Sequence, residues 1–449
     1  MKKRRQCMPP RRWRMPILAP LILLVLYSLL PYDHALRLSV RFNLNAVAAA
    51  LPTPFPNRWW LTEKNVAFSV SLRDEVALVI KSGYGTKDRI APWLQAHEPA
   101  EFDNLLLVGD FSTPPGRPYD YHGHPVPVHD VVAQMLQNGS LPAHLVHPRL
   151  LKYSNLTAAI ARGDDESARD LSRSFGWELD ALKFIAGLEL CYQQMPDKKW
   201  YVVADDDTYL VQPSVQRLLE HLDPTVPYYV GNAVGDYKAR FAHGGSSLIL
   251  SQATMRTLFA NPAAVWAAHM EALEEKWGDK LVATVLIKIG IYLEERHAIF
   301  FNGEQPPVTK ISAERFCAPI ASFHGLAAGS DMLSVGETFQ PFTEPVLWID
   351  LWDLYRAPSF NSPVLVTGHT NWDYVGRLDE HTMTISDVIS AGNCRRICQG
   401  RSSFCLAWTW DSRQQACHLS PWMIVGEMAQ GRTSGINVPR AKNLAAECR

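Results

Sequence analysis

The chain has 449 residues, of which 47% are hydrophobic and 20% are charged, and its formal net charge at pH 7 is −1. This composition is too apolar for a disordered protein, and the balanced charge lacks the basic excess of a typical nucleic-acid-binding protein. Five of the eight cysteines follow residue 390, which indicates a small disulfide-bonded module at the C-terminus.

The N-terminal region predicts a membrane anchor. Residues 2–14 carry seven basic side chains and residues 15–32 carry no charge, and about 18 helical residues can span a thin bilayer. The basic residues on the N-terminal side of the uncharged run favour a cytosolic N-terminus. We therefore expect a cytosolic tail (1–14), a single-pass type II anchor (15–32) and a lumenal remainder. A cleaved signal peptide is the competing interpretation, although the small residues at 46–50 lie farther past the apolar run than an ordinary cleavage site.

Residues 33–72 are expected to form a stem that is extended where prolines crowd residues 51–56. From Glu75 onward, apolar runs of strand length alternate with helical patterns. Runs that are apolar throughout are typical of parallel sheets covered by helices on both faces. The segment 112–130, rich in Pro, Gly and His, predicts a loop. The expected strands are Val76–Ile80, Leu105–Val108, Trp200–Val203, Tyr228–Val230 and Ser247–Leu250, and the expected helices are Leu179–Gln193, Ser251–Phe259 and Leu281–Glu294.

Three adjacent carboxylates, Asp205, Asp206 and Asp207, directly follow one of these strands. The carboxyl ends of strands in an open α/β sheet are where ligands bind. Adjacent carboxylates repel one another and need a cation, and Mn²⁺ or Mg²⁺ prefers such hard oxygen ligands. An acidic turn without a ligand is the alternative, because Asp is common in turns.

Four motifs occur in a characteristic order: Trp200-Tyr-Val-Val-Ala-Asp-Asp-Asp-Thr-Tyr209, Phe241-Ala-His-Gly-Gly-Ser246, Trp277-Gly-Asp279 and Ser322-Phe-His324. Together they resemble glycosyltransferase family 31, in particular its fringe-like and core 1 β-1,3-galactosyltransferase-like branch and its fungal members. The resemblance covers residues 73–345. It implies an α/β fold of the GT-A nucleotide-diphospho-sugar transferase type, Mn²⁺ dependence and inversion at the anomeric carbon.

The resemblance also implies roles for individual residues. Asp207 and His324 would ligate the metal, and Asp279 would be the general base that takes a proton from the acceptor hydroxyl. The UDP-sugar would contact a further set: Lys81, Arg89, Asp205, Asp206, Gly244 and Gly245. Each assignment has a structural alternative. These alternatives are a helix N-cap for Asp279, a hairpin turn for the glycine pair, a hydrogen-bonded core residue for His324 and solvated surface charges for Lys81 and Arg89.

The C-terminal cysteines Cys394, Cys398, Cys405 and Cys417 lie in a short aromatic-rich segment. Four cysteines allow three pairings, and a zinc site is a rival that an oxidising lumen disfavours. The spacing resembles a PAN/apple domain over residues 390–449, preceded by a connector (346–389). That resemblance implies the pairs Cys394–Cys417 and Cys398–Cys405 and a role in binding protein or carbohydrate. Cys448 is left to pair with Cys191 or Cys317, or to link two chains into a homodimer.

These observations predict an inverting glycosyltransferase of the Golgi or endoplasmic reticulum membrane. It would transfer a hexose or N-acetylhexosamine from a UDP-sugar to a glycan or glycoprotein acceptor, in β-1,3 linkage. A catalytically inactive relative that binds glycans or proteins is one alternative, against which the intact acidic triplet, His324 and Asp279 argue. A metal-dependent hydrolase is another, but it would usually need more His and Asp ligands at strand ends.

Overall fold

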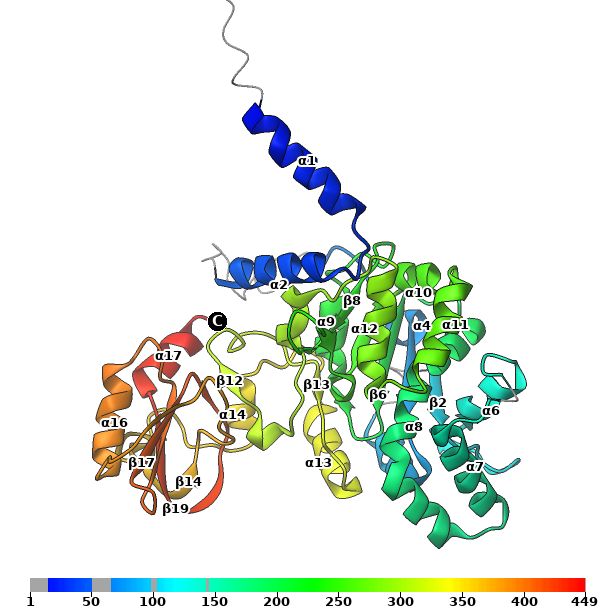
Figure 1. The fold of residues 1–449 in the computed structure, drawn as a ribbon. Coiled ribbons are helices and arrows are strands. Elements are labelled where there is room, and N and C mark those ends of the chain that lie inside the picture. The colour runs from blue at the N-terminus through cyan, green and yellow to red at the C-terminus, as the bar shows by residue number, and fades with distance from the viewer. Residues whose placement is uncertain (1–14, 51–65, 98–102, 143–144, 449) are drawn as a thin grey trace, which may run out of the picture.

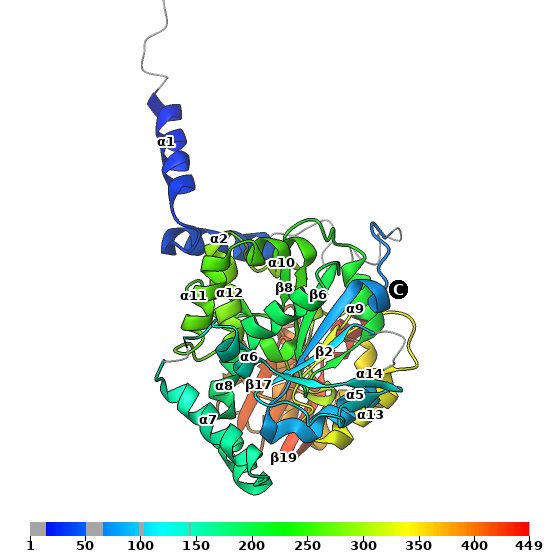
Figure 2. The ribbon, with the colours of Figure 1, turned by 90° about the vertical axis from the view of Figure 1, so that its right-hand side faces the viewer.

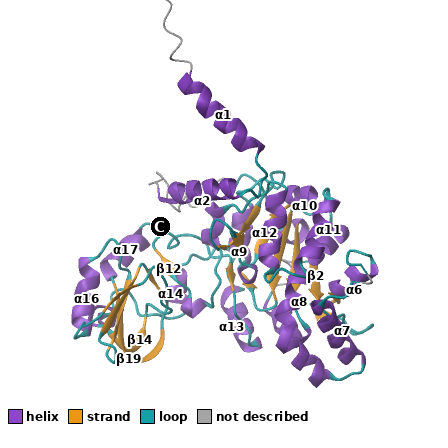
Figure 3. Ribbon diagram, in the orientation of Figure 1, coloured by secondary structure: helices purple, strands orange, loops and turns teal. Residues whose placement is uncertain are grey.

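The computed structural model describes residues 15–50, 66–97, 103–142 and 145–448. Two sheets of four or more strands organise the described residues, one with six strands and one with five. The six-stranded sheet lies in the larger domain, and the five-stranded sheet lies in the C-terminal domain beside it (Figures 1 and 3). The α/β character of the larger domain agrees with the fold class expected from the sequence.

The six-stranded sheet has the strand order β5-β2-β1-β6-β11-β8. Strands β5, β2, β1 and β6 run parallel, and β11 pairs antiparallel with both β6 and β8. The five predicted strands are confirmed, with ends that shift by one or two residues. Their bounds are Val76–Lys81 (β1), Leu105–Gly109 (β2), Trp200–Asp205 (β6), Tyr229–Gly231 (β8) and Leu248–Ser251 (β11).

The loop predicted at 112–130 is wrong in part, because this segment contains three short strands. They are β3 (Tyr119–Tyr121), β4 (His124–Val126) and β5 (Val128–Asp130). Val126 and Val128 are buried, and β5 forms an edge of the six-stranded sheet. Proline lacks the N–H group that a central strand needs, but it is tolerated at the edge of a sheet. The proline-rich composition therefore predicted a loop where the structure has short edge strands.

Alternate residues of β1 face two hydrophobic clusters on opposite sides of the sheet. Val76, Leu78 and Ile80 pack with α5, α9 and α13, whereas Ala77 and Val79 pack with the longer helix α8 and its neighbours. Figure 2 shows α5 and α13 side by side. The covering helices are α5 (Ile90–Ala96), α9 (Gln212–Leu219) and α13 (Gly329–Phe339) on one face, and α6 (Val131–Gln137), α7 (Pro148–Ala161), α8 (Asp165–Gln194), α10 (Gln252–Phe259), α11 (Pro262–Glu271) and α12 (Gly278–Lys288) on the other.

The three predicted helices are present, but two of them, α8 and α12, have clearly different bounds. Helix α8 begins at Asp165, well before Leu179, with the Asp164 side chain accepting a hydrogen bond from the Ser167 N–H as its N-cap. Helix α12 ends at Lys288 because Gly290 adopts a φ of +87°, a conformation that terminates helices. Short elements complete the larger domain: α4 (Leu72–Glu75), η2 (Tyr84–Arg89), β7 (Tyr209–Leu210), β9 (Ala233–Val234), β10 (Phe241–Ala242), η3 (Gly244–Ser246), η4 (Glu295–Phe300), η5 (Pro306–Val308) and β13 (Ser322–Phe323).

Among the described residues, two helices precede the larger domain, α1 (Met15–Leu29) and α2 (Ala35–Ala50). In the described part of the chain, no helix has both the length and the apolarity needed to cross a membrane. Helix α2 lies within the segment expected to be a stem (33–72) and runs along the larger domain (Figure 1). The Arg41 guanidinium stacks on the Tyr292 ring at 4.4 Å, and the Asn45 side chain donates to Glu295 at 2.8 Å. The proline-rich residues 51–56 lie outside the described residues.

The C-terminal domain is an antiparallel sheet of order β14-β19-β16-β17-β15 that packs against α16. Its disulfides are Cys394–Cys417 and Cys398–Cys405, as the resemblance implied. Two of its strands lie in the segment expected to be a connector, so the sheet begins at His369. The elements are α14 (Asp350–Leu354), α15 (Pro363–Thr367), β14 (His369–Asp373), β15 (Met383–Ile385), α16 (Ala391–Gly400), β16 (Ala407–Asp411), β17 (Ala416–Ser420), β18 (Trp422–Met423), β19 (Glu427–Ile436) and α17 (Val438–Ala446).

Several contacts join the two domains, among them a salt bridge between Lys310 and Asp379 at 2.7 Å. Strand β12 (Ile311–Ser312) of the larger domain pairs with β18. Cys448 forms a disulfide with Cys317, which takes Cys448 away from a link between chains, and Cys191 is the one unpaired cysteine among those the structure describes. Side chains of both domains also share one hydrophobic cluster, including Phe316 and Trp348 from the larger domain and Met423 and Ile436 from the C-terminal domain.

Candidate active site

A cleft of about 600 Å³ lies where β1 and β6 end. The parallel register of these strands places Lys81 opposite Asp205. Turn η2, helix α8, turn η3 and the start of α12 supply the other walls. The structure brings all nine predicted site residues into this cleft: Lys81, Arg89, Asp205, Asp206, Asp207, Gly244, Gly245, Asp279 and His324.

Asp205, Asp207 and His324 form a group that could hold a metal ion. Each offers one ligand atom, and these atoms lie within 4.8 Å of one another. Strand pairing explains the convergence, because β7 follows the acidic triplet and pairs with β13, which ends next to His324. Two carboxylates and an imidazole suit Mn²⁺ and Mg²⁺, the imidazole favouring Mn²⁺. Asp205, which the sequence analysis assigned to the UDP-sugar, thus joins Asp207 and His324 in this candidate group.

Asp207 and His324 each stabilise the charged form of the other side chain. The His324 Nε2 atom lies 3.4 Å from Asp207 Oδ1. Burial acts to raise the pKa of Asp207, but the hydrogen bond and charge of His324 and the charge of Arg89 hold it below its ordinary value. Burial acts to lower the pKa of His324, but Asp207 raises it overall. A divalent cation would displace the shared proton, since metal ligands bind in their deprotonated forms.

Asp206 holds the turn after β1 rather than facing the metal group. Its carboxylate accepts hydrogen bonds from the Ser82 hydroxyl at 2.7 Å and the Thr86 hydroxyl at 2.6 Å, and its side chain is nearly fully buried. Burial raises its pKa to about 6. Arg89 bridges this residue and the metal group, because one guanidinium nitrogen lies 3.3 Å from Asp206 and 3.1 Å from Asp207. Arg89 is therefore placed beside any anion bound at the metal group.

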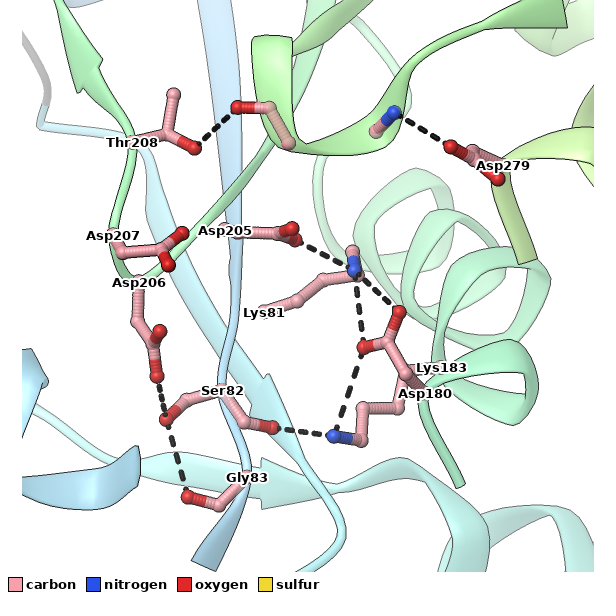
Figure 4. A network of polar contacts seen from close by, with 12 residues as sticks. Lys81, Ser82, Gly83, Asp180, Lys183, Asp205, Asp206, Asp207, Thr208 and Asp279 are labelled. Carbon is pink, nitrogen blue, oxygen red and sulfur yellow. Dashed lines mark hydrogen bonds and ion pairs between the residues drawn. The ribbon is translucent and has the colours of Figure 1, made fainter. Parts of the chain in front are cut away.

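Lys81 lies beneath the cleft, paired with two carboxylates (Figure 4). Its ammonium is 2.6 Å from Asp205 and 3.0 Å from Asp180, and its side chain is 2% exposed. Burial acts to lower its pKa, but the two carboxylates raise it above the ordinary value, so Lys81 stays charged. The surface-charge alternative for Lys81 is therefore wrong.

The sequence analysis missed Asp180 and Lys183 on α8. Lys183 donates to the Ser82 carbonyl at 2.8 Å and pairs with the buried Asp110 at 3.1 Å. Together with Lys81 they tie α8 to the end of β1. Asp180 and Lys183 are three residues apart in the segment Leu179–Gln193, whose apolar spacing predicted this helix. Lys183 is buried among the apolar residues of α8, and a lysine on the apolar face of a helix is costly unless it is paired, which was the signal available in the sequence.

Gly244 and Gly245 form the 3-10 turn η3, so the hairpin alternative is wrong. A Cβ atom on Gly245 would lie 2.3 Å from His324 Nε2, and one on Gly244 would lie 2.7 Å from the Phe184 ring. The Thr208 hydroxyl donates to the Gly245 carbonyl at 2.7 Å, which fixes the turn against the acidic triplet. The glycine pair therefore makes room for the side chains of the site.

Asp279 is the second residue of α12 and lines the cleft. Trp277 is the N-cap of this helix, so the N-cap alternative for Asp279 is wrong. Its carboxylate accepts hydrogen bonds from the backbone N–H groups of Gly244 at 2.7 Å and Lys280 at 2.8 Å. Burial raises its pKa above the ordinary value, against the effect of these two hydrogen bonds. A carboxylate with a raised pKa is a better proton acceptor in catalysis.

Comparison with known families agrees with this geometry. Residues 178–355 match the family model described as Fringe-like, and residues 371–428 match the PAN domain model. The first match contains the acidic triplet, the glycine pair, Asp279 and His324. The chain thus carries a Fringe-like domain of the family 31 glycosyltransferase type and a PAN domain, which confirms the resemblance seen in the sequence.

Proposed function

We propose that this protein is an inverting, metal-dependent glycosyltransferase that transfers a hexose or N-acetylhexosamine from a UDP-sugar to a glycan or glycoprotein acceptor, in β-1,3 linkage. The observation that carries the proposal is the convergence of Asp205, Asp207 and His324 in the cleft of a Fringe-like domain that also contains Asp279. Fringe-like enzymes use a UDP-sugar and a divalent metal.

The residues of the cleft divide the reaction between them. Asp205, Asp207 and His324 would hold the divalent cation, which would supply Lewis-acid stabilisation of the diphosphate leaving group. Arg89 adds a positive charge beside Asp207 for the same diphosphate. Asp279 accepts the proton of the acceptor hydroxyl while the hydroxyl oxygen attacks the anomeric carbon of the donor sugar. The bond from that carbon to the diphosphate oxygen breaks on the opposite face, so the configuration inverts.

The test is product analysis with a panel of UDP-sugars, with and without Mn²⁺, on the purified protein and on Asp207→Ala and His324→Ala. We expect transfer from one donor that depends on Mn²⁺, and weaker Mn²⁺-dependent UDP binding in both variants. Retained UDP binding without transfer from any donor would identify an inactive binding relative instead. Release of free sugar with no acceptor dependence would indicate a hydrolase.

We further propose that the protein is a type II membrane protein of the Golgi or endoplasmic reticulum. The uncharged residues 15–32 behind seven basic side chains support this orientation. Three disulfides support an oxidising compartment for the domains that follow. Mature protein whose N-terminus begins near residue 51 would identify a cleaved signal peptide and overturn the anchor.

A further inference from the structure

Two half-exposed tryptophans line the same cleft as Asp279 and have no assigned role. Trp177 on α8 and Trp277 at the N-cap of α12 are each 53% exposed. Large aromatic side chains usually bury most of their surface. Two of them left open at the wall of one cleft indicate a surface that receives a ligand.

The two rings contact the same lysine, although they are far apart in sequence. The Lys276 ammonium lies 5.7 Å from the Trp177 ring centroid and 5.0 Å from the Trp277 ring centroid, so one cation contacts both faces. Gly278 brings the helices together, because a Cβ atom there would lie 2.3 Å from the Phe184 ring of α8. The rings are therefore held by packed helices rather than by a loose loop.

The residues around the rings are polar and follow one face of α8. Arg173, Trp177 and Asp180 are spaced by three or four residues, and all line the cleft with Lys276. An apolar platform with charged groups at its rim matches a sugar ring, which presents C–H groups on its face and hydroxyls around its edge. Trp277 also lies two residues from Asp279, the residue proposed to take the acceptor's proton.

We propose that Trp177 and Trp277 form the acceptor subsite, a platform on which the terminal pyranose ring of the acceptor stacks. This inference rests on the proposed function, since it assigns the acceptor side by the position of Asp279. Lys276 holds the two rings in place, while Arg173 and Asp180 offer hydrogen bonds to the hydroxyls of the ring. Trp177 and Trp277 act in this proposal as binding residues that set the affinity for the acceptor.

The test measures binding directly, on the full-length protein loaded with UDP and Mn²⁺. Methyl hexopyranosides are titrated while tryptophan fluorescence is followed, because these probes carry no aromatic group of their own. We expect Trp177→Ala and Trp277→Ala each to weaken binding by roughly 5- to 30-fold, and the corresponding Phe variants to recover part of the loss. Trp266→Ala is the matched control, since Trp266 on α11 is 54% exposed and is not among the residues that line the cleft.

The outcomes separate this inference from the proposed function. If the Ala variants bind the glycosides as the wild type does, or if no glycoside binds, the platform is wrong. If the variants lose UDP affinity instead, the rings hold the donor and the acceptor assignment is overturned. If binding depends on both tryptophans but no sugar is transferred, the platform stands and the proposed transferase activity fails. In active protein, a higher acceptor KM with little change in kcat supports the platform, whereas a fall in kcat alone contradicts it.

Discussion

Asp279 is the residue whose replacement separates chemistry from binding. Asp279→Asn keeps the size of the side chain and one oxygen that can accept from the Gly244 N–H. We expect transfer to fall by at least about a hundredfold, mainly in kcat, because a general base contributes about 10²–10⁴ in rate. UDP affinity in the presence of Mn²⁺ should stay within a few-fold of wild type. Kinetics and a UDP titration on one preparation measure both quantities. Transfer close to the wild-type rate would show that Asp279 only fixes turn η3.

A substitution at Gly245 is a second test of the group formed by Asp205, Asp207 and His324. A Cβ atom at this position would lie 2.3 Å from His324 Nε2, so Gly245→Ala should push the imidazole away from Asp205 and Asp207. We expect UDP affinity to fall in the presence of Mn²⁺ and to change little without it. A parallel titration of His324→Ala provides the reference for complete loss of this ligand. Unchanged Mn²⁺-dependent affinity in Gly245→Ala would mean that His324 is not a ligand.

His97 makes the stability of the larger domain depend on pH. It is fully buried, accepts a hydrogen bond from the Leu210 N–H and contacts the Trp93 carbonyl. Burial lowers its pKa from 6.5 to about 4. Between these values the unfolded chain binds a proton that the folded chain does not, so stability is present above pH 6.5 and falls as the pH drops. The loss attributable to His97 is up to about 3 kcal/mol near pH 4.

Denaturant unfolding at pH 7 and pH 5 measures this term. In His97→Gln the difference in unfolding free energy between the two pH values should be smaller than in the wild type. An equal difference in both proteins would assign the pH dependence to other groups.

The sequence predicted which residues line the site better than it predicted the contacts that these residues make. Asp207, His324 and Asp279 could be found because a motif places each next to a strand or helix end. No pattern in the sequence revealed that Gly245 leaves space for His324, or that Lys81 pairs with Asp205 and Asp180. Those relations depend on how α8 and turn η3 pack on the sheet. Tertiary packing of this kind involves residues that are distant in sequence and has no local signal.

Among the elements, α2 shows what a stem can contribute. Leu38 and Phe42 lie one turn apart and are partly buried, and with Tyr292 and Leu293 they line a small apolar pocket between α2 and the larger domain. The apolar spacing of Leu38 and Phe42 is visible in the sequence, but it does not show which surface these side chains contact. The strands of the sheet were predictable because each is a continuous apolar run, whereas β5 was hidden by Pro125 and Pro127.

A pair of N-terminal truncations measures the contribution of α2. Protein beginning at Pro31 lacks α1 and keeps α2, and protein beginning at residue 60 lacks both. Partial burial of Leu38 and Phe42 is worth about 1–2 kcal/mol, so the shorter protein should melt roughly 1–3 °C lower. Thermal unfolding of the two proteins at equal concentration checks this. Equal melting temperatures would mean that α2 contributes nothing to the stability of the larger domain.

At the scale of the whole molecule, the PAN domain is joined to the larger domain by a strand pair, a disulfide and a shared hydrophobic cluster. Removing residues 390–449 would break the β12–β18 pair and the Cys317–Cys448 disulfide and expose the shared hydrophobic cluster. We therefore expect the truncated protein to aggregate rather than to remain a folded transferase domain. The fraction of soluble protein and its UDP binding are the measurements. A soluble truncated protein with wild-type UDP affinity would show that the domains are independent.

The double variant Cys317→Ser/Cys448→Ser is the matched control for this deletion. It removes the covalent link and keeps the strand pair and the hydrophobic cluster. We expect it to lose about 2–4 kcal/mol of unfolding free energy. It should still bind UDP, because neither cysteine is among the residues lining the cleft.

The pairing of β12 with β18 also sets an order of events during synthesis. Ile311 and Cys317 emerge from the ribosome more than a hundred residues before their partners Met423 and Cys448. Contacts that close such long loops form late. Until Met423 and Cys448 have been made, the larger domain carries an unpaired strand and an open thiol, which are sites of aggregation and wrong pairing. Residues made more than a hundred positions later thus decide whether the larger domain reaches its finished form.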